Sequence, residues 1–309
     1  MTEMVRAEAF ALGDVVPDFP DLSDLRDRPL FTYSHAGQGA FRRRLIRLVE
    51  LLSGSARMER LYRDWQQAPR DRRASIFTEA LRILRIRTEF TAGGPECIPA
   101  RGGVLVVANH PYGIADGLAL GDLVARVRPD VKLMVHSLLC QPAEARGALL
   151  PVDFSGGAGA RRTSAATRRA AVDWLEAGHV LVIFPAGGVA TAPHPLSRRA
   201  ADPAWHPFAA RLATRPGVQV VPVYVHGQNS RLFQIVSHYS YPLRVALLFR
   251  ETLRRQGGAV RLAVGRAERV TEADKSGITT LLRRMTLRLA GPQGPLPETE
   301  FVYPARLRW

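Results

Sequence analysis

The stretch from Val104 to Asp116 constrains the fold of this chain more than any other. Residues 104–108 form a continuous apolar run between a turn-prone Arg-Gly-Gly sequence and a polar, proline-containing break. Such a short, valine-rich run predicts a buried strand. A helical pattern follows Asp116, with apolar residues at Leu120, Leu123, Val124 and Val127. A strand joined to a helix by a short loop is typical of α/β folds, which often carry functional side chains in such loops.

Two residues of this loop, His110 and Asp116, have side chains that can cooperate in acid–base chemistry. An aspartate at this position can cap the helix that begins there. It can also accept a hydrogen bond from a nearby imidazole, which fixes the tautomer of the ring and raises its basicity. The alternative is a loop histidine beside a helix cap, with no catalytic role for either residue.

The motif Asn109-His110-Pro111, followed by Asp116, resembles the His-and-Asp motif of the glycerolipid acyltransferase superfamily, of the lysophosphatidic acid acyltransferase type. In most members four residues separate the histidine from the aspartate, whereas here five do, with Gly113 available to absorb the extra residue. This longer form resembles the hemolysin-like branch of the superfamily. The resemblance implies that His110 and Asp116 are catalytic and that Asn109 and Gly113 help to form the substrate site.

A second predicted strand, residues 180–184, runs into Phe184-Pro185-Ala186-Gly187-Gly188. This turn resembles the third superfamily motif, Phe-Pro-Glu-Gly-Thr, but Ala186 replaces the usual glutamate. Gly188 stands where the hemolysin-like branch usually carries an acid. The turn therefore offers no carboxylate to acceptor hydroxyls. Pro185, Gly187 and Gly188 remain candidate substrate contacts, because turn glycines can donate backbone N–H groups to an anion.

Two more segments complete the resemblance, which covers roughly residues 86–270. The Val-Pro-Val strand at 221–223 and the Gly-x-Asn-Ser-Arg sequence after it resemble the fourth motif, and add Asn229 and Arg231 to the candidate site. The glycine-rich loop before Arg161 and Arg162 opens a predicted helix, whose N-terminus favours anions. The superfamily has an acceptor-binding arginine in this region, which makes Arg161 the candidate and Arg162 its neighbour. The alternative is a loop with solvated arginines.

The order of predicted elements indicates an α/β fold with a central mixed, mostly parallel sheet flanked by helices and preceded by a helical N-terminal part. We expect three parts: an irregular lead-in and N-terminal helices over residues 1–85, an acyltransferase α/β domain over 86–290, and a Pro-rich, loosely packed tail over 291–309. Strands are predicted at residues 86–91, 104–108, 131–135, 149–153, 180–184, 218–225 and 259–264. Helices are predicted at residues 41–53, 57–67, 74–85, 116–127, 209–213, 247–255 and 278–289, with one more after the glycine-rich loop.

The charge of the chain predicts an anionic partner. Its formal net charge is +15 over 309 residues, and nearly all of its basic residues are arginine, which binds phosphate bidentately. The predicted helix at 41–53 has Phe41, Leu45, Leu48 and Leu52 on one face and arginines opposite. It can lie in an anionic membrane interface or pack on the protein's own core. Nucleic acid is not expected, because the arginines are dispersed and no nucleic-acid-binding motif is present.

The composition also limits where in the cell the protein is expected and which metal or disulfide sites it can form. Residues 1–20 lack the features of a secretory signal, and no run of apolar residues is long enough to span a bilayer. We expect a cytoplasmic protein that is peripheral on the inner face of the cell membrane. Cys97 and Cys140 form neither a disulfide framework nor a metal cluster. Cys140 beside His136 is a weaker nucleophile candidate, because its surroundings are apolar.

The sequence therefore predicts an O-acyltransferase without metal or redox cofactor. The resemblance supplies acyl-CoA or acyl carrier protein as acyl donor and a lyso-lipid as acceptor: lysophosphatidic acid, another lysophospholipid or a lyso-ornithine lipid. Two alternatives stay open. A lipid or thioester hydrolase would use the same His110–Asp116 pair, and a catalytically silent membrane-associated protein would explain the missing acid at 186 or 188. The sequence does not indicate the oligomeric state.

Overall fold

The computed structural model describes residues 39–68, 74–153, 157–270, 275–292, 294 and 299–303. The predicted lead-in, residues 1–38, lies outside these residues. The strands are β1 (Arg87–Ala92), β2 (Val104–Ala108), β3 (Val131–His136), β4 (Leu149–Val152), β5 (Val180–Ile183), β6 (Gln219–His226) and β7 (Ala259–Val264). The α-helices are α2 (Ala40–Leu52), α3 (Ser55–Gln67), α4 (Ile76–Leu84), α5 (Ile114–Ala125), α6 (Ala158–Glu176), α7 (Phe208–Ala213), α8 (Arg231–Val236), α9 (Tyr241–Leu253) and α10 (Lys275–Arg288). Short 3-10 helices are η1 (Pro95–Cys97), η2 (Ser137–Cys140) and η3 (Ala143–Ala148).

One sheet of seven strands organises the described residues, in the order β1-β7-β6-β2-β5-β3-β4. Neighbouring strands are parallel except for β6 and β7, which run antiparallel. The predicted mixed, mostly parallel sheet is therefore confirmed. Because β2, β3, β4, β5 and β6 share one direction, the loops after them meet at the same edge of the sheet.

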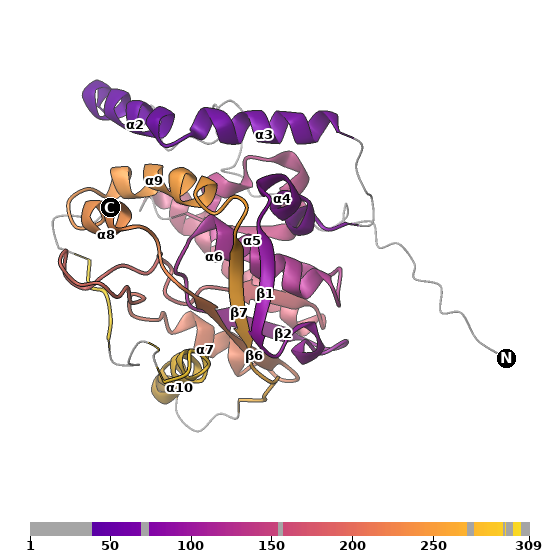
Figure 1. The fold of residues 1–309 in the computed structure, drawn as a ribbon. Coiled ribbons are helices and arrows are strands. Elements are labelled where there is room, and N and C mark those ends of the chain that lie inside the picture. The colour runs from indigo at the N-terminus through magenta and orange to yellow at the C-terminus, as the bar shows by residue number, and fades with distance from the viewer. Residues whose placement is uncertain are drawn as a thin grey trace.

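The central strand β2 is buried on both faces. Val106 and Ala108 pack into one hydrophobic cluster with residues of α4 and α5, and Leu105 and Val107 pack into another with residues of α6, α7 and α10. A strand covered on both sides has no polar face, which explains its continuous apolar run. Figure 1 shows α2 and α3 lying across one end of the molecule, over α9 and α4.

The helix α2 packs with a different face from the one that its sequence pattern predicts. Ile46, Glu50 and Ser53 are buried, and α2 contacts α9. Phe41, Leu48 and Leu52 of the predicted apolar face are 81%, 53% and 76% exposed. The side chain of Leu45, the fourth member of that face, lies outside the described residues. This helix therefore packs on the protein while also presenting apolar side chains to its surroundings.

The second half of the chain differs from the prediction in three places. The helix α9 begins at Tyr241 rather than 247, and the six-residue helix α8 was not predicted. The tail is not loosely packed throughout, because Phe301 is only 1% exposed. Its backbone N–H donates to the carbonyl of Asp202 at 3.0 Å, and its ring contacts the ring of His238 edge-on. This part of the tail belongs to the core.

Candidate active site

The loop after β2 begins with a side chain that extends the sheet. Asn109 is buried, and its amide donates to the carbonyl of Val225 at 2.9 Å and accepts from the N–H of the same residue at 2.7 Å. Both polar atoms are therefore used to hold the end of β2 against β6. Asn109 does not line the cavity described below, and its predicted role as a substrate contact stays a prediction.

His110 and Asp116 form a hydrogen-bonded pair. The Nδ1 of His110 lies 3.0 Å from the Oδ2 of Asp116, which is fully buried. The same oxygen accepts the backbone N–H groups of Tyr112 at 2.8 Å and Gly113 at 2.9 Å. The carboxylate is thereby fixed by the loop that it closes, and it can hold the imidazole in one tautomer.

Gly113 is the residue that allows five residues to separate the pair. It precedes the first residue of α5 and has a φ of 87°, a region that favours glycine. The helix starts at Ile114, so Asp116 lies within its first turn rather than at the cap position. From there its side chain reaches back to the free N–H groups before the helix, as an acid three residues into a helix commonly does.

The backbone and ring of His110 are held from other parts of the chain. Its N–H donates to Oδ1 of Asp202 at 3.1 Å, and its carbonyl accepts from the N–H of Ala190 at 2.7 Å. Its ring stacks on that of Phe184, with centroids 3.9 Å apart and an interplanar angle of 22°. Nε2 is the ring nitrogen left to meet a substrate proton. Burial raises the pKa of the Asp202 carboxyl above its usual value.

A cavity of about 920 Å³ opens beside the pair. One wall contains His110, Gly113 and the turn from Phe184 to Val189. Apolar side chains of α3, α4, α5 and the strands β3 and β4 line much of the same space. They include Met58, Leu61, Trp65, Phe77, Ala80, Ile83, Leu118, Leu133 and Leu149. A large and mostly apolar space suits a long hydrocarbon chain, with its reactive end at the histidine.

Polar and charged side chains form a minority of the cavity lining. Arg168 of α6 is exposed, whereas Arg244 of α9 is only 3% exposed. His136 also lines the cavity, and burial lowers its pKa to about 4. Burial likewise lowers the pKa of Arg244. Arg244 and His136 therefore lie in poorly hydrated surroundings, where charges interact more strongly than in water.

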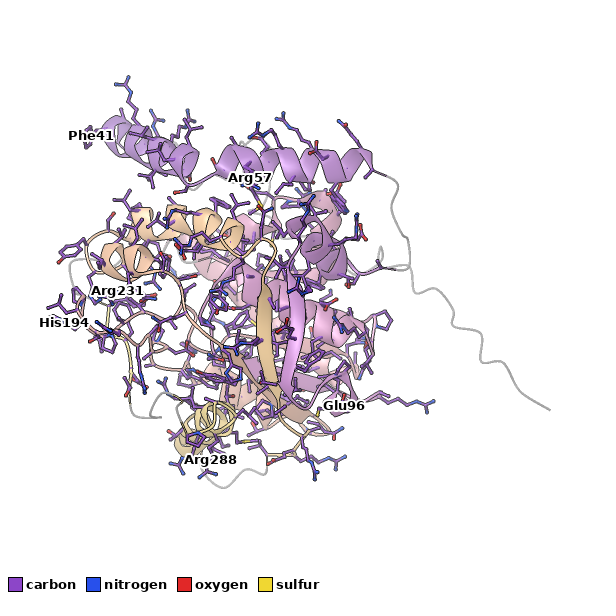
Figure 2. The ribbon with its side chains drawn as sticks, in the orientation of Figure 1. Phe41, Arg57, Glu96, His194, Arg231 and Arg288 are labelled. Carbon is purple, nitrogen blue, oxygen red and sulfur yellow. The ribbon has the colours of Figure 1, made fainter. Side chains whose placement is uncertain are left out.

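The other residues predicted from the motifs divide into two groups. Pro185, Gly187 and Gly188 line the cavity with Gly113. Arg161 and Arg162 lie exposed in the first turn of α6, and neither lines it. Asn229 is buried and donates to the carbonyl of Tyr112 at 3.4 Å. Arg231 lies at the surface (Figure 2), where it donates to the carbonyls of Ser197 and Pro195.

The glycine turn differs in detail from the predicted one. The N–H of Gly187 donates to the carbonyl of Phe184 at 2.9 Å, so it closes the turn and is not available to a ligand. The N–H of Gly188 has no hydrogen-bond partner among the described residues. Of the two predicted donors, only Gly188 can bind a developing anion without breaking the turn.

Sequence reasoning missed Asp202, which holds the backbone of His110, and also Arg244 and Tyr303, which line the same cavity as His110. Each reaches the site from a segment far along the chain, and none belongs to a local pattern. The sequence made Cys140 the weaker nucleophile candidate, and burial raises the pKa of this thiol to about 12. Within the described residues, no cluster of histidine, cysteine or acidic side chains could hold a metal ion. No helix there is both long and apolar enough to cross a bilayer.

Comparisons with known proteins identify the family. A family model described as acyltransferase matches residues 60–285. A search of curated proteins found no match. Among solved structures, the 1-acyl-sn-glycerophosphate (LPA) acyltransferase of Thermotoga maritima is similar over 82% of this chain and 99% of that chain, with 17% identity and a TM-score of 0.44. The hemolysin-like branch stays a prediction. The family model covers well over half of the sequence, so the chain belongs to the acyltransferase family, and the superfamily predicted from its motifs is confirmed.

Proposed function

We propose that this chain moves a fatty acyl group from an acyl thioester to the hydroxyl of a lyso-lipid, with His110 as general base. The donor carrier is coenzyme A or acyl carrier protein. The acceptor is lysophosphatidic acid, another lysophospholipid or a lyso-ornithine lipid. One observation carries the proposal: His110, hydrogen-bonded to the buried Asp116, lies on the wall of a large, mostly apolar cavity. Such a cavity can hold an acyl chain while a hydroxyl approaches Nε2 of the histidine.

The proposed reaction needs only the histidine and the aspartate as acid–base groups. Nε2 of His110 takes the proton of the acceptor hydroxyl while the hydroxyl oxygen attacks the thioester carbonyl carbon. A C–O bond forms and the carbonyl becomes a tetrahedral oxyanion. The C–S bond then breaks, and the imidazolium returns its proton to the departing thiolate. Asp116 stabilises the imidazolium between these steps through its bond to Nδ1.

The oxyanion needs a donor, and Gly188 is the candidate. Its unused N–H belongs to the turn beside Phe184, whose ring stacks on His110. A preorganised backbone N–H aimed at developing charge typically accelerates acyl transfer by about 10²- to 10³-fold. Because Gly187 closes the turn with its own N–H, the geometry of Gly188 is fixed before substrate binds.

The exposed side chains of α2 support a peripheral membrane position. Phe41, Leu48, Leu51 and Leu52 are exposed on a helix that also carries the exposed Arg44 and Arg47. Figure 2 shows Phe41 on α2, at the outside of the molecule. Apolar side chains can enter the headgroup region while arginines meet anionic lipid. We propose the inner face of the cell membrane as this surface, where lyso-lipid acceptors are available.

A hydrolase is the second candidate, since the same pair could activate water. Whole protein is incubated with acyl-labelled coenzyme A and, separately, with labelled acyl carrier protein, each with a panel of lyso-lipids. Transfer of label to a diacyl lipid supports the proposal. Label only in free fatty acid identifies a hydrolase, and no turnover with either donor supports a silent protein. His110→Ala is the control, because background hydrolysis persists without the histidine.

A further inference from the structure

Arg244 is a buried cation on the wall of the active-site cavity. Its guanidinium donates to the hydroxyl of Thr191 and to the carbonyl of Val189. Its Cζ lies 5.0, 5.7 and 5.3 Å from the ring centroids of Phe233, Phe301 and Tyr303. Among the described residues, no carboxylate forms an ion pair with it. A guanidinium has five N–H donors, so these two hydrogen bonds leave it with donors to spare.

A buried charge without a counter-ion is costly, and buried charges in proteins are normally paired. The carbonyl, the hydroxyl and the aromatic faces around Arg244 compensate its charge only in part. Because Arg244 lines a cavity, a bound anion could supply the missing charge. Arginine suits phosphate and carboxylate, to which its planar group donates two parallel hydrogen bonds.

Tyr303 occupies the space beside Arg244 that a side chain at position 188 would need. A Cβ atom added to Gly188 would lie 2.4 Å from the hydroxyl oxygen of Tyr303. Tyr303 lies beyond the end of the family match at residue 285, in the segment that packs on Asp202. A phenol hydroxyl, which can donate to an anion, therefore stands beside the Gly188 turn on the cavity wall.

The segment from Gly188 to Ala190 joins this corner of the cavity to the catalytic histidine. Arg244 donates to the carbonyl of Val189, and the N–H of the next residue, Ala190, donates to the carbonyl of His110 at 2.7 Å. Both Arg244 and Tyr303 line the same cavity as His110. A ligand held at this corner is thus held within the space where the hydroxyl must react.

We propose that Arg244 and Tyr303 form an anion subsite that binds the phosphate or carboxylate in the acceptor's head group. This inference rests on the proposed function. In this proposal the guanidinium of Arg244 and the phenol of Tyr303 recognise the anion of the acceptor. No motif acid that binds the acceptor's hydroxyls is needed. An anionic lyso-lipid is then the preferred acceptor class.

Calorimetric titration of the whole chain tests the subsite without turnover. The probes are glycerol 3-phosphate, glycerate as its carboxylate counterpart, inorganic phosphate and neutral glycerol. We expect glycerol 3-phosphate or glycerate to bind, and Arg244→Gln to weaken that binding roughly ten- to a hundredfold. Arg254→Gln, which removes an exposed charge at the end of the same helix, should leave it unchanged. Equal binding by Arg244→Gln, or inorganic phosphate binding as tightly as both head-group probes, overturns the proposal.

Substitutions at Tyr303 and Gly188 test the subsite even if the Arg244→Gln protein does not fold. Tyr303→Phe removes only the hydroxyl and should weaken binding roughly two- to tenfold. Gly188→Ala should displace Tyr303 and weaken binding, but should add nothing in a Tyr303→Ala background, because the collision is then gone. Unchanged binding in both Tyr303→Phe and Gly188→Ala overturns the role of Tyr303.

Failure of the subsite can be told apart from failure of the proposed function. Glycerol 3-phosphate that binds through Arg244 in a chain without acyl transfer upholds the subsite alone. Acyl transfer with an unchanged acceptor KM in Arg244→Gln and Tyr303→Phe upholds the function alone.

Discussion

The backbone N–H of His110 donates to Oδ1 of Asp202 at 3.1 Å, across 92 positions of sequence. The other carboxylate oxygen of Asp202 accepts the indole N–H of Trp205 at 3.1 Å. The general base of the proposed reaction is therefore held twice: its ring by Asp116 and its backbone by Asp202. Asp202 does not touch the reacting atoms, so it acts as a positioning residue.

We expect Asp202→Asn to lower kcat roughly ten- to a hundredfold while the KM values change little. An amide has only one accepting atom, so one of the two N–H donors loses its partner and the histidine shifts. Steady-state kinetics with both substrates measures this. Asp130→Asn is the matched control, because Asp130 pairs with Arg128 and His179 and does not touch His110. An unchanged kcat in folded Asp202→Asn would show that this bond does not position the base.

His110 and Asp116 should behave as one catalytic unit. We expect His110→Ala to reduce kcat roughly 10²- to 10⁴-fold, which is the usual contribution of a general base. Asp116→Asn should lose much of the activity, and the double variant should be little worse than His110→Ala. Circular dichroism spectra and melting temperatures check that the variants fold. Additive losses in the double variant would mean that Asp116 acts independently of the imidazole.

The pairing of His110 with Asp116, the proposed catalytic residues, could be predicted because their relationship is local. They lie six positions apart in one strand–loop–helix unit, and the strand, the glycine and the helix each have a sequence pattern. Asp202 contacts this loop, and Arg244 and Tyr303 reach the same cavity, only through the order of the strands and the packing of the C-terminal segment. No periodicity encodes such contacts. The position of β7 between β1 and β6, parallel to β1 and antiparallel to β6, and the short helix α8 were hidden for the same reason.

The exposed face of α2 predicts salt-sensitive binding to anionic vesicles. We expect sedimentation with anionic vesicles to fall steeply as salt rises, since the Debye length is about 10 Å at 0.1 M and shrinks further above it. Replacing Phe41, Leu48 and Leu52 by serine should weaken binding further, because their burial in the membrane is lost. Leu196→Ser, at an exposed leucine elsewhere, is the control. Equal binding to neutral and anionic vesicles would contradict the predicted electrostatic contribution to membrane binding.

Arg168 rather than Arg161 should affect substrate use. Arg161 was the predicted acceptor contact, but Arg168, seven residues along α6, is the one that lines the cavity. Because Arg168 is exposed at the rim, we expect it to meet the phosphates of the donor's carrier. Arg168→Ala should raise the donor KM roughly two- to fivefold, less at high salt, with little effect on the acceptor KM. Arg161→Ala and Arg169→Ala are controls outside the cavity lining, and a donor KM raised equally by either would contradict this assignment.

His136 should make the stability of the protein depend on pH. Burial lowers its pKa from 6.5 to about 4 in the folded chain. Between these values the unfolded state binds a proton that the folded state does not, so stability falls as pH falls from 6.5 towards 4. The loss from this group between pH 6.5 and pH 5 is about 2 kcal/mol. Urea unfolding at these two pH values, in wild type and in His136→Asn, measures it.

The His136→Asn variant separates the contribution of His136 to the pH dependence of stability from that of the other histidines. His136→Asn removes the titrating group, so its unfolding free energy should fall less between pH 6.5 and pH 5 than that of the wild type. His194→Asn, at an exposed histidine outside the cavity lining, should keep the wild-type dependence. Because His136 lines the cavity beside the proposed acyl site, the protonated form would also bring a charge into apolar surroundings. Acyl transfer should therefore weaken over the same pH range. If His136→Asn and wild type lose the same free energy on acidification, the imidazole is not kept neutral by burial.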